Sequence, residues 1–176
     1  MNHPAPPGLP ASARTAATRP DKIREPRDLV RVLAPARAAG RRVALSQGCF
    51  DLVHLGHLRH FKEARTLADI LVVAVTADAH VNKGPGRPLF TLAERIEWVA
   101  ELECVDFVVP SHVPTAVELL GLLKPDVYIR GAEYRDTKSD DARFVAEQAV
   151  VAGYGGAVRF SDDPLVRSST RLQREL

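Results

Sequence analysis

Two histidines, His54 and His57, lie three residues apart in the stretch GCFDLVHLGH at residues 48–57. Asp51 precedes the first histidine, and Gly56 lies between the two. The pair is compatible with a metal site, a catalytic base with a neighbour, or a cradle for an anion. Zinc usually takes three or four protein ligands, and no companion Cys/His cluster is present. An isolated pair of this kind also occurs as ordinary loop and helix-cap residues.

The elements around this stretch favour the anion cradle. A short strand is predicted at residues 41–47, and a helix with apolar residues at every third position is predicted over 55–67. The connection would place both imidazoles beside the free backbone amides of a helix N-terminus, whose dipole attracts phosphate. Gly56 permits close approach of the backbone.

Strands and helices alternate along the rest of the chain. Apart from the two elements above, strands are predicted at 70–78, 105–110, 126–130 and 157–160, and helices at 25–40, 91–102, 114–123, 141–153 and 169–176. Pro35 is expected to interrupt or kink the first helix, and Thr91 with Glu94 forms a capping box. The alternation predicts an α/β fold, a Rossmann-like doubly wound parallel sheet with ligands at the carboxyl ends of its strands.

Composition limits the classes of function. A chain of 176 residues with 45% hydrophobic residues suits a single domain. A net charge of +2 favours neither a nucleic-acid partner nor a membrane partner. Two cysteines without a CxxC pattern favour a cytoplasmic location. Residues 1–21 lack the apolar core of a secretory signal and are expected to be a disordered leader, which leaves 22–176 as the domain.

The stretch GCFDLVHLGH resembles the His-x-Gly-His signature of the cytidylyltransferase-like nucleotidyltransferase superfamily. Three further stretches are similar, in order and spacing, to the adenylyltransferase domain of bacterial ADP-heptose synthases and to related sugar-phosphate nucleotidyltransferases: KGPGRPLFTLAERIEWVAELECVDFVV, LLKPDVYIRGAEY and RSST. Phosphoethanolamine and glycerol-phosphate cytidylyltransferases are less similar. The resemblance implies that a nucleoside triphosphate and a phosphorylated small molecule give a nucleotide-activated product and pyrophosphate.

The resemblance also implies catalytic roles for four residues. His54 and His57 would stabilise the charge that develops as the α-phosphorus becomes five-coordinate. Lys83 and Arg95 would neutralise the phosphates of the nucleotide and the acceptor. The acceptor phosphate already carries nearly two negative charges at neutral pH, so the attack needs alignment and charge neutralisation rather than a general base.

Further residues are expected to bind the two substrates. Asp78 and Arg87 are expected at the acceptor. In RSST, Ser169 and Thr170 would form a second anion cradle, although such residues also cap helices. Mg²⁺ is expected to accompany the triphosphate, held mainly by phosphate oxygens and water, and no protein metal site is expected. The residues expected to bind the nucleotide are Gly48, Cys49, Phe50, Asp51, Gly56, Arg130, Gly131, Glu133, Ser168, Ser169 and Thr170.

Departures from the family pattern leave the acceptor open. The first strand ends in SQ where close relatives usually have Thr-Asn, and RGAEY replaces the Lys-Gly-Gly-Asp-Tyr of a heptose enzyme. Heptose enzymes are often fused to a sugar kinase, and none is found in these residues, so the acceptor is expected from another protein. A sugar 1-phosphate is favoured over a polyol phosphate, an alcohol phosphate or a phosphonate, and ATP over CTP. A catalytically silent nucleotide-binding module is the competing hypothesis, and a homodimer is expected because relatives pair after the second strand.

Overall fold

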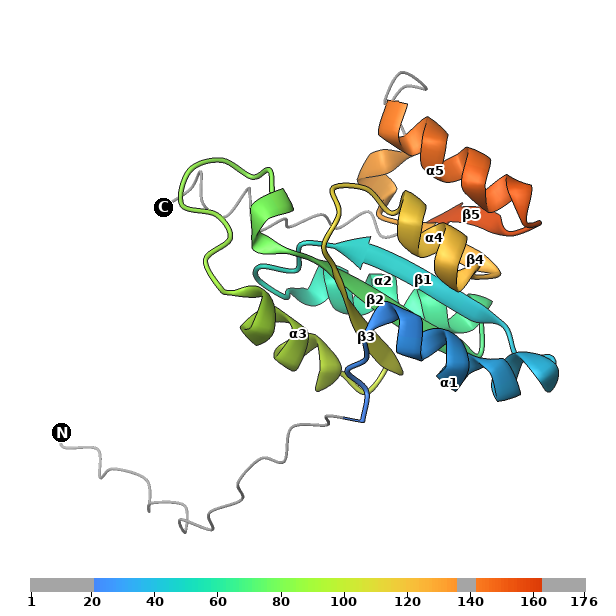
Figure 1. The fold of residues 1–176 in the computed structure, drawn as a ribbon. Coiled ribbons are helices and arrows are strands. Elements are labelled where there is room, and N and C mark those ends of the chain that lie inside the picture. Colours follow the sequence, from blue (N-terminus) through green and yellow to red (C-terminus); the bar gives the residue numbers. More distant parts are fainter. Residues whose placement is uncertain (1–20, 136–141, 163–176) are drawn as a thin grey trace, which may run out of the picture.

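A single parallel sheet forms the centre of the molecule. The structure is a computed structural model that describes residues 21–135 and 142–162. Within these residues the five strands are β1 (Val43–Gly48), β2 (Ile70–Thr76), β3 (Phe107–Ser111), β4 (Val127–Arg130) and β5 (Ala157–Phe160), in the order β3-β2-β1-β4-β5 (Figure 1). Every neighbouring pair is parallel. The predicted α/β fold with a doubly wound parallel sheet in a single domain is confirmed.

Helices cover both faces of this sheet (Figure 1). The α-helices are α1 (Pro26–Ala38), α2 (Leu55–Leu67), α3 (Leu92–Ala100), α4 (Val117–Leu123) and α5 (Ala142–Gly153), with short 3₁₀ helices η1 (Asp78–His80) and η2 (Ala132–Tyr134). Apolar residues of α1, α4 and α5 form one core cluster with the sheet, and those of α2 and α3 form the other. Strand β2 is buried on both faces, which explains its continuous apolar sequence.

The structure tests two predictions about individual helices, the capping box at Thr91 and the interruption at Pro35. The capping box is confirmed, because the Thr91 amide donates to Glu94 Oε2 at 2.8 Å and the Glu94 amide donates to Thr91 Oγ1 at 3.4 Å. The expected interruption at Pro35 is wrong, because α1 continues through this residue to Ala38. Pro35 lies in the last turn, and the fully buried Leu33 anchors the helix on the sheet, so packing outweighs the missing backbone hydrogen bond. The predicted helix 169–176 lies outside the described residues.

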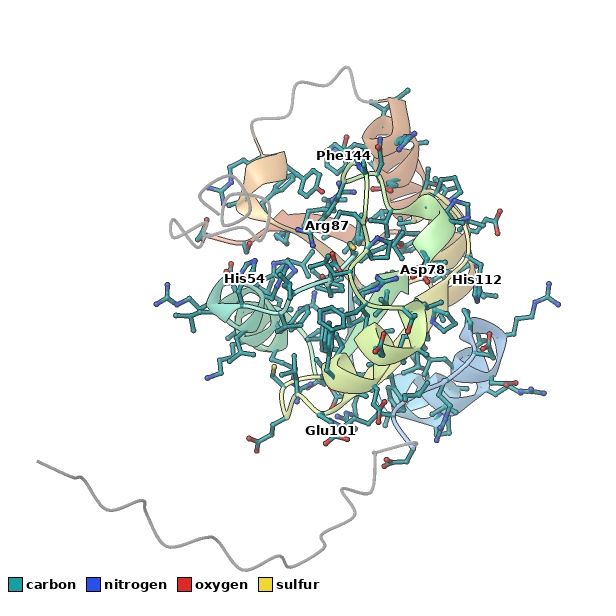
Figure 2. The ribbon with its side chains drawn as sticks, turned by 90° about the vertical axis from the view of Figure 1, so that its left-hand side faces the viewer. His54, Asp78, Arg87, Glu101, His112 and Phe144 are labelled. Carbon is teal, nitrogen blue, oxygen red and sulfur yellow. The ribbon has the colours of Figure 1, made fainter. Side chains whose placement is uncertain are left out.

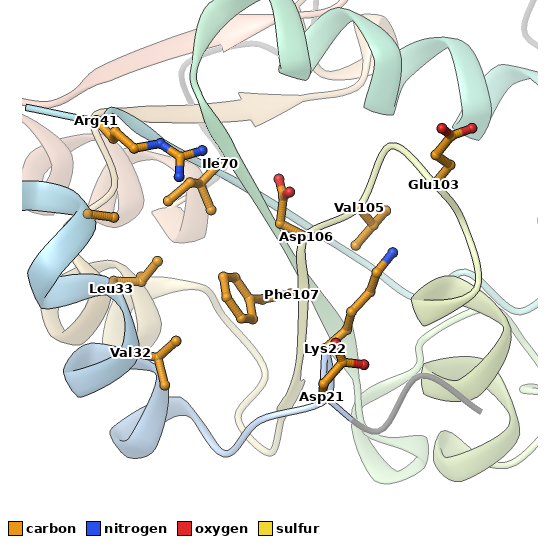
Figure 3. Close-up of a pocket in the computed structure, with 11 residues that line it drawn as sticks. Asp21, Lys22, Val32, Leu33, Arg41, Ile70, Glu103, Val105, Asp106 and Phe107 are labelled. Carbon is orange, nitrogen blue, oxygen red and sulfur yellow. The ribbon is translucent and has the colours of Figure 1, made fainter. Parts of the chain in front are cut away.

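A cavity of about 460 Å³ lies at the amino ends of two strands (Figure 3). Ile70 and Phe107, the first residues of β2 and β3, line it together with residues of α1 and charged groups such as Lys22 and Asp106. The loops that follow the carboxyl ends of the strands lie at the opposite end of the sheet. This cavity is therefore separate from the place where parallel sheets of this class bind ligands. No helix in the described ranges has the length and apolar character needed to cross a membrane.

Candidate active site

The loop that follows β1 is shaped by a close contact between Gly48 and Phe50. Phe50 has a positive φ of 51°, an unusual conformation for a bulky residue, and its ring folds back over Gly48. A Cβ atom at Gly48 would lie 2.8 Å from Phe50 Cζ, so any other residue there would displace the Phe50 ring. The ring is held between His57 and Phe61, at 5.2 Å from each ring centroid. The aromatic residue of the motif thus fixes the turn into α2.

The two histidines lie together at the beginning of α2. His54 is the N-cap residue, and its ring stacks on the ring of His57 with centroids 3.9 Å apart. The backbone amide of His54 donates to His57 Nδ1 at 3.3 Å. Burial, reinforced by the nearby charges of His54 and Lys83, lowers the pKa of His57 to about 3. His57 is therefore neutral at pH 7, with its proton on Nε2, where it can donate to an anion.

Asp51 joins this loop to the one that precedes α3. Its side chain is fully buried and forms an ion pair with Arg87, whose side chain is 2% exposed. Asp51 Oδ1 also accepts from the backbone amides of Leu89 at 2.7 Å and Phe90 at 3.2 Å. Both Asp51 and Arg87, expected to bind substrates, are thus engaged with each other in this structure. Across Figure 2, Arg87 lies between the labelled His54 and Asp78.

Arg95 is a fully buried cation that connects three segments of the site. Its Nε donates to the Phe90 carbonyl at 2.9 Å, and its Nη1 donates to the carbonyl of Cys49. Its Nη2 donates to the carbonyl of Thr76 at 2.8 Å and to Asp78 Oδ1 at 2.6 Å. Arg95 itself has no solvent exposure. In this structure its guanidinium therefore holds loops in place rather than facing a ligand.

Lys83 lies close enough to Cys49 for its positive charge to affect the pKa of the thiol. Lys83 is exposed in the loop after η1, and its charge acts on both Cys49 and His57. Burial raises the pKa of the Cys49 thiol, and the charges of Lys83 and Arg95 counteract this only in part. Cys49 is therefore a neutral thiol at pH 7, which does not favour a role as a nucleophile.

A second group of expected residues follows β4. Arg130 ends this strand and forms an ion pair with the buried carboxylate of Glu147 on α5. Gly131 is the N-cap residue of η2, and Glu133 lies within that short helix. β1 and β4 are adjacent parallel strands, so this loop neighbours the loop of the two histidines. Ser168, Ser169 and Thr170 lie outside the described residues.

The structure thus brings most of the expected residues to the carboxyl ends of the strands, in segments that follow β1, β2 and β4. Sequence reasoning missed Glu147 and Tyr128, which hold Arg130 in place. A signal for Glu147 exists, because it is the acidic residue on the apolar face of α5 that Phe144 and Val151 define. Among the described residues, no three His, Cys, Asp or Glu side chains gather to hold a metal ion.

Comparisons with known proteins agree with this geometry. The cytidylyltransferase-like family model matches residues 45–172. The bifunctional protein HldE of Syntrophotalea carbinolica is 37% identical over 92% of this chain and 32% of its own length. HldE of Hahella chejuensis is 41% identical over 74% of this chain and 26% of its own length. The chain therefore spans about a third or less of these curated relatives.

A solved structure is also similar. The lipopolysaccharide core biosynthesis protein from Thermoplasma volcanium matches with a TM-score of 0.56 and 30% identity, covering 69% of this chain and 94% of that one. The resemblance inferred from the four sequence stretches is confirmed by these matches. The family model covers well over half of the chain, and the protein belongs to the cytidylyltransferase-like family of nucleotidyltransferases.

Proposed function

We propose that this nucleotidyltransferase transfers AMP from ATP to a small phosphorylated acceptor, a sugar 1-phosphate, with release of pyrophosphate. The observation that carries the proposal is the neutral His57, whose Nδ1 accepts a backbone hydrogen bond and whose Nε2 proton is left for a ligand. A fixed neutral donor at a helix N-terminus suits the charge that develops on a phosphate in the transition state. The resemblance to the adenylyltransferase domain of ADP-heptose synthases favours ATP and a sugar phosphate.

In the proposed reaction an oxygen of the acceptor phosphate attacks the α-phosphorus. A new P–O bond forms, and the bond to the bridging oxygen breaks, so that pyrophosphate leaves with the electron pair. The attacking oxygen is already anionic, and no proton has to be removed. We assign His54 and His57 to the α-phosphate and Lys83 to the phosphates that approach its loop. We assign Arg95 and Asp51 to the positioning of that loop, because both are buried and bonded to protein groups.

We also propose that Mg²⁺ enters with the triphosphate and neutralises its charge. The described site offers imidazoles and a lysine, and its nearest fully buried carboxylate, Asp51, is taken by Arg87 and two amides. Such a donor set fits a cation held by phosphate oxygens and water rather than by a protein cage. Excess EDTA should abolish turnover and added Mg²⁺ should restore it, whereas a zinc-selective chelator in excess Mg²⁺ should leave the rate unchanged. A loss with the zinc chelator would contradict this assignment.

The test of the function is pyrophosphate release across a panel of triphosphates and acceptors. We expect release with ATP and one or more sugar 1-phosphates, and release about 10²- to 10³-fold slower with His57→Ala under the same conditions. Release only with CTP and a polyol phosphate, an alcohol phosphate or a phosphonate would replace the adenylyltransferase proposal by a cytidylyltransferase. Tight nucleotide binding without turnover on any acceptor would favour a silent regulatory module.

We further propose that the enzyme works in the cytoplasm as a homodimer. The support for pairing is the family resemblance, because relatives pair after the second strand and two-fold dimers are the commonest assemblies. Light scattering at micromolar concentration should give twice the mass of the chain. A monomer mass would remove this proposal without affecting the reaction.

A further inference from the structure

Glu147 is a charged residue on the buried face of α5, where it lies near the aromatic Phe144. It is only 4% exposed, and a carboxylate at this depth requires partners. Its Oε1 accepts from the backbone amide of Ala116 at 3.0 Å. Its Oε2 accepts from the Tyr128 hydroxyl at 3.1 Å and pairs with Arg130. Glu147 thus connects α5, the beginning of α4 and the end of β4.

Arg130 is held by this carboxylate and by aromatic rings. Its Nη1 donates to Glu147 and, at 3.1 Å, to the Tyr128 hydroxyl. Its guanidinium carbon lies 4.0 Å from the centroid of the Tyr134 ring and 5.2 Å from that of Phe144. These distances are within the range of cation–π attraction. A guanidinium fixed at one edge in this way also fixes the ring of Tyr134 that lies against it.

Tyr134 has further ring surface that Arg130 does not cover. The residue is 38% exposed and ends η2, directly after β4. Ser46 on β1 pairs with Ile129 on β4, so Arg130 is level with Gln47, one residue before the histidine loop begins at Gly48. The exposed ring therefore belongs to the loop next to the proposed phosphate site.

Gln47 provides an independent sign of a ligand at this place. Its side-chain oxygen Oε1 is buried and has no hydrogen-bond partner among the described residues. Because residues level with each other on parallel strands share a face, Gln47 and Arg130 point to the same side of the sheet. A buried end of an amide side chain without a partner favours a polar ligand at this place, such as a ribose hydroxyl or a base amino group.

We propose that Glu147 is a positioning residue which, through Arg130, holds the Tyr134 ring as the stacking platform for the nucleobase. The proposal rests on the function proposed above and adds to it the subsite of the base. Stacking on an aromatic side chain strengthens nucleotide binding about 5- to 100-fold and tolerates any base. Discrimination between bases then falls to polar groups such as the Gln47 amide.

The experiment compares ATP with inorganic tripolyphosphate, which carries the phosphates without the nucleoside, in calorimetric titrations with Mg²⁺. Tyr134→Leu should weaken ATP binding about 5- to 100-fold and leave tripolyphosphate binding unchanged. Tyr134→Phe should restore the affinity for ATP. Glu147→Gln keeps the size of the side chain and an acceptor for the Ala116 amide but removes the charge. Glu147→Gln should weaken the binding of ATP but not of tripolyphosphate. Added to Tyr134→Leu in a double variant, it should cause no further loss of affinity for ATP.

Glu118→Gln, an exposed acid on α4, is the matched control and should bind as the wild type does. Equal losses for ATP and tripolyphosphate in Tyr134→Leu would overturn the platform, as would wild-type affinity for ATP in that variant. A wild type that binds both probes equally would overturn it as well. A wild type that prefers ATP but releases no pyrophosphate would contradict the proposed function and leave the platform standing. Should Glu147→Gln not fold, Tyr134→Leu, altered at an exposed position, still decides the platform.

Discussion

The protonation state of His57 is set by its surroundings before any substrate arrives. A backbone amide occupies Nδ1, burial keeps the ring neutral, and the stacked ring of His54 disfavours a second positive charge beside it. The remaining Nε2 proton is a donor fixed in direction. In the proposed reaction such a donor would need no reorganisation when charge develops on the α-phosphate, and its contribution would therefore fall mainly on the rate.

Replacement of either histidine should separate the rate from binding. His54→Ala and His57→Ala should each lower turnover about 10²- to 10³-fold, or roughly 3 to 4 kcal/mol, while the nucleotide dissociation constant changes much less. Initial rates and titrations measure the two effects, and melting midpoints show whether the fold persists. If His57 only capped α2, its Ala variant would lose about 1 kcal/mol of stability and keep its activity. Near-wild-type turnover in both variants would refute the anion cradle.

His60 makes stability depend on pH. Burial lowers the pKa of His60 to about 4, and its Nε2 lies 2.8 Å from Ser46 Oγ. Between pH 6.5, the ordinary value, and about 4 the unfolded chain binds a proton that the folded chain does not. The free energy of unfolding should therefore fall as the pH falls through this window, by up to about 3 kcal/mol from His60.

His57, with its pKa lowered from 6.5 to about 3, should add a loss of its own over the window from pH 6.5 to about 3. Urea unfolding at pH 7 and at pH 4.5 measures the effect. His60→Gln should show a smaller difference between these two conditions than the wild type. An unchanged difference in this variant would show that His60 is not the group responsible.

At the scale of elements, the loop at residues 84–90 is held to the rest of the site by two buried charges. Asp51 binds it through Arg87 and two amides, and Arg95 on α3 binds the carbonyl of Phe90. The capping box at Thr91 then fixes where α3 begins. These contacts place Lys83, directly before the loop, near the histidines. In the proposed reaction these buried charges would therefore act by fixing backbone rather than by touching phosphate.

Arg87→Leu tests this connection. The change removes the cation that faces the buried Asp51 carboxylate, and breaking a buried ion pair from one side costs about 3–5 kcal/mol. We expect a loss near the lower end of that range, because two backbone amides still bind Asp51. The double variant Asp51→Asn/Arg87→Leu should recover part of the stability, since no buried charge then remains without its partner. Denaturant midpoints at an unchanged m-value measure both. A double variant that is less stable than Arg87→Leu would contradict the argument.

At the scale of the whole molecule, the positions of helices and strands could be predicted from the sequence better than the contacts between them. The helix predicted over 55–67 is α2 at those bounds, because its apolar spacing and its position after a strand agree. The strand order could not be read from the chain, since it depends on which edges meet in space. The burial of Arg95 could not be predicted from the sequence either, because a cation on an amphipathic helix is usually solvated. Only the carbonyls that surround Arg95 in the fold make its burial favourable.

Which nucleotide base the protein prefers can be measured through the stability of the whole fold. A ligand that binds only the folded state stabilises it by about 2.7 kcal/mol at one hundred times its dissociation constant. For a domain of this size that corresponds to a rise of roughly 5–10 °C in the melting midpoint. ATP with Mg²⁺ should therefore raise the midpoint clearly more than CTP at the same concentration. The His57→Ala variant should keep most of this rise with ATP, because the proposed hydrogen bond from His57 strengthens mainly in the transition state and not in the bound ground state. A shift with CTP and none with ATP would make the protein a cytidylyltransferase, with its histidine cradle unchanged and its nucleoside subsite reassigned.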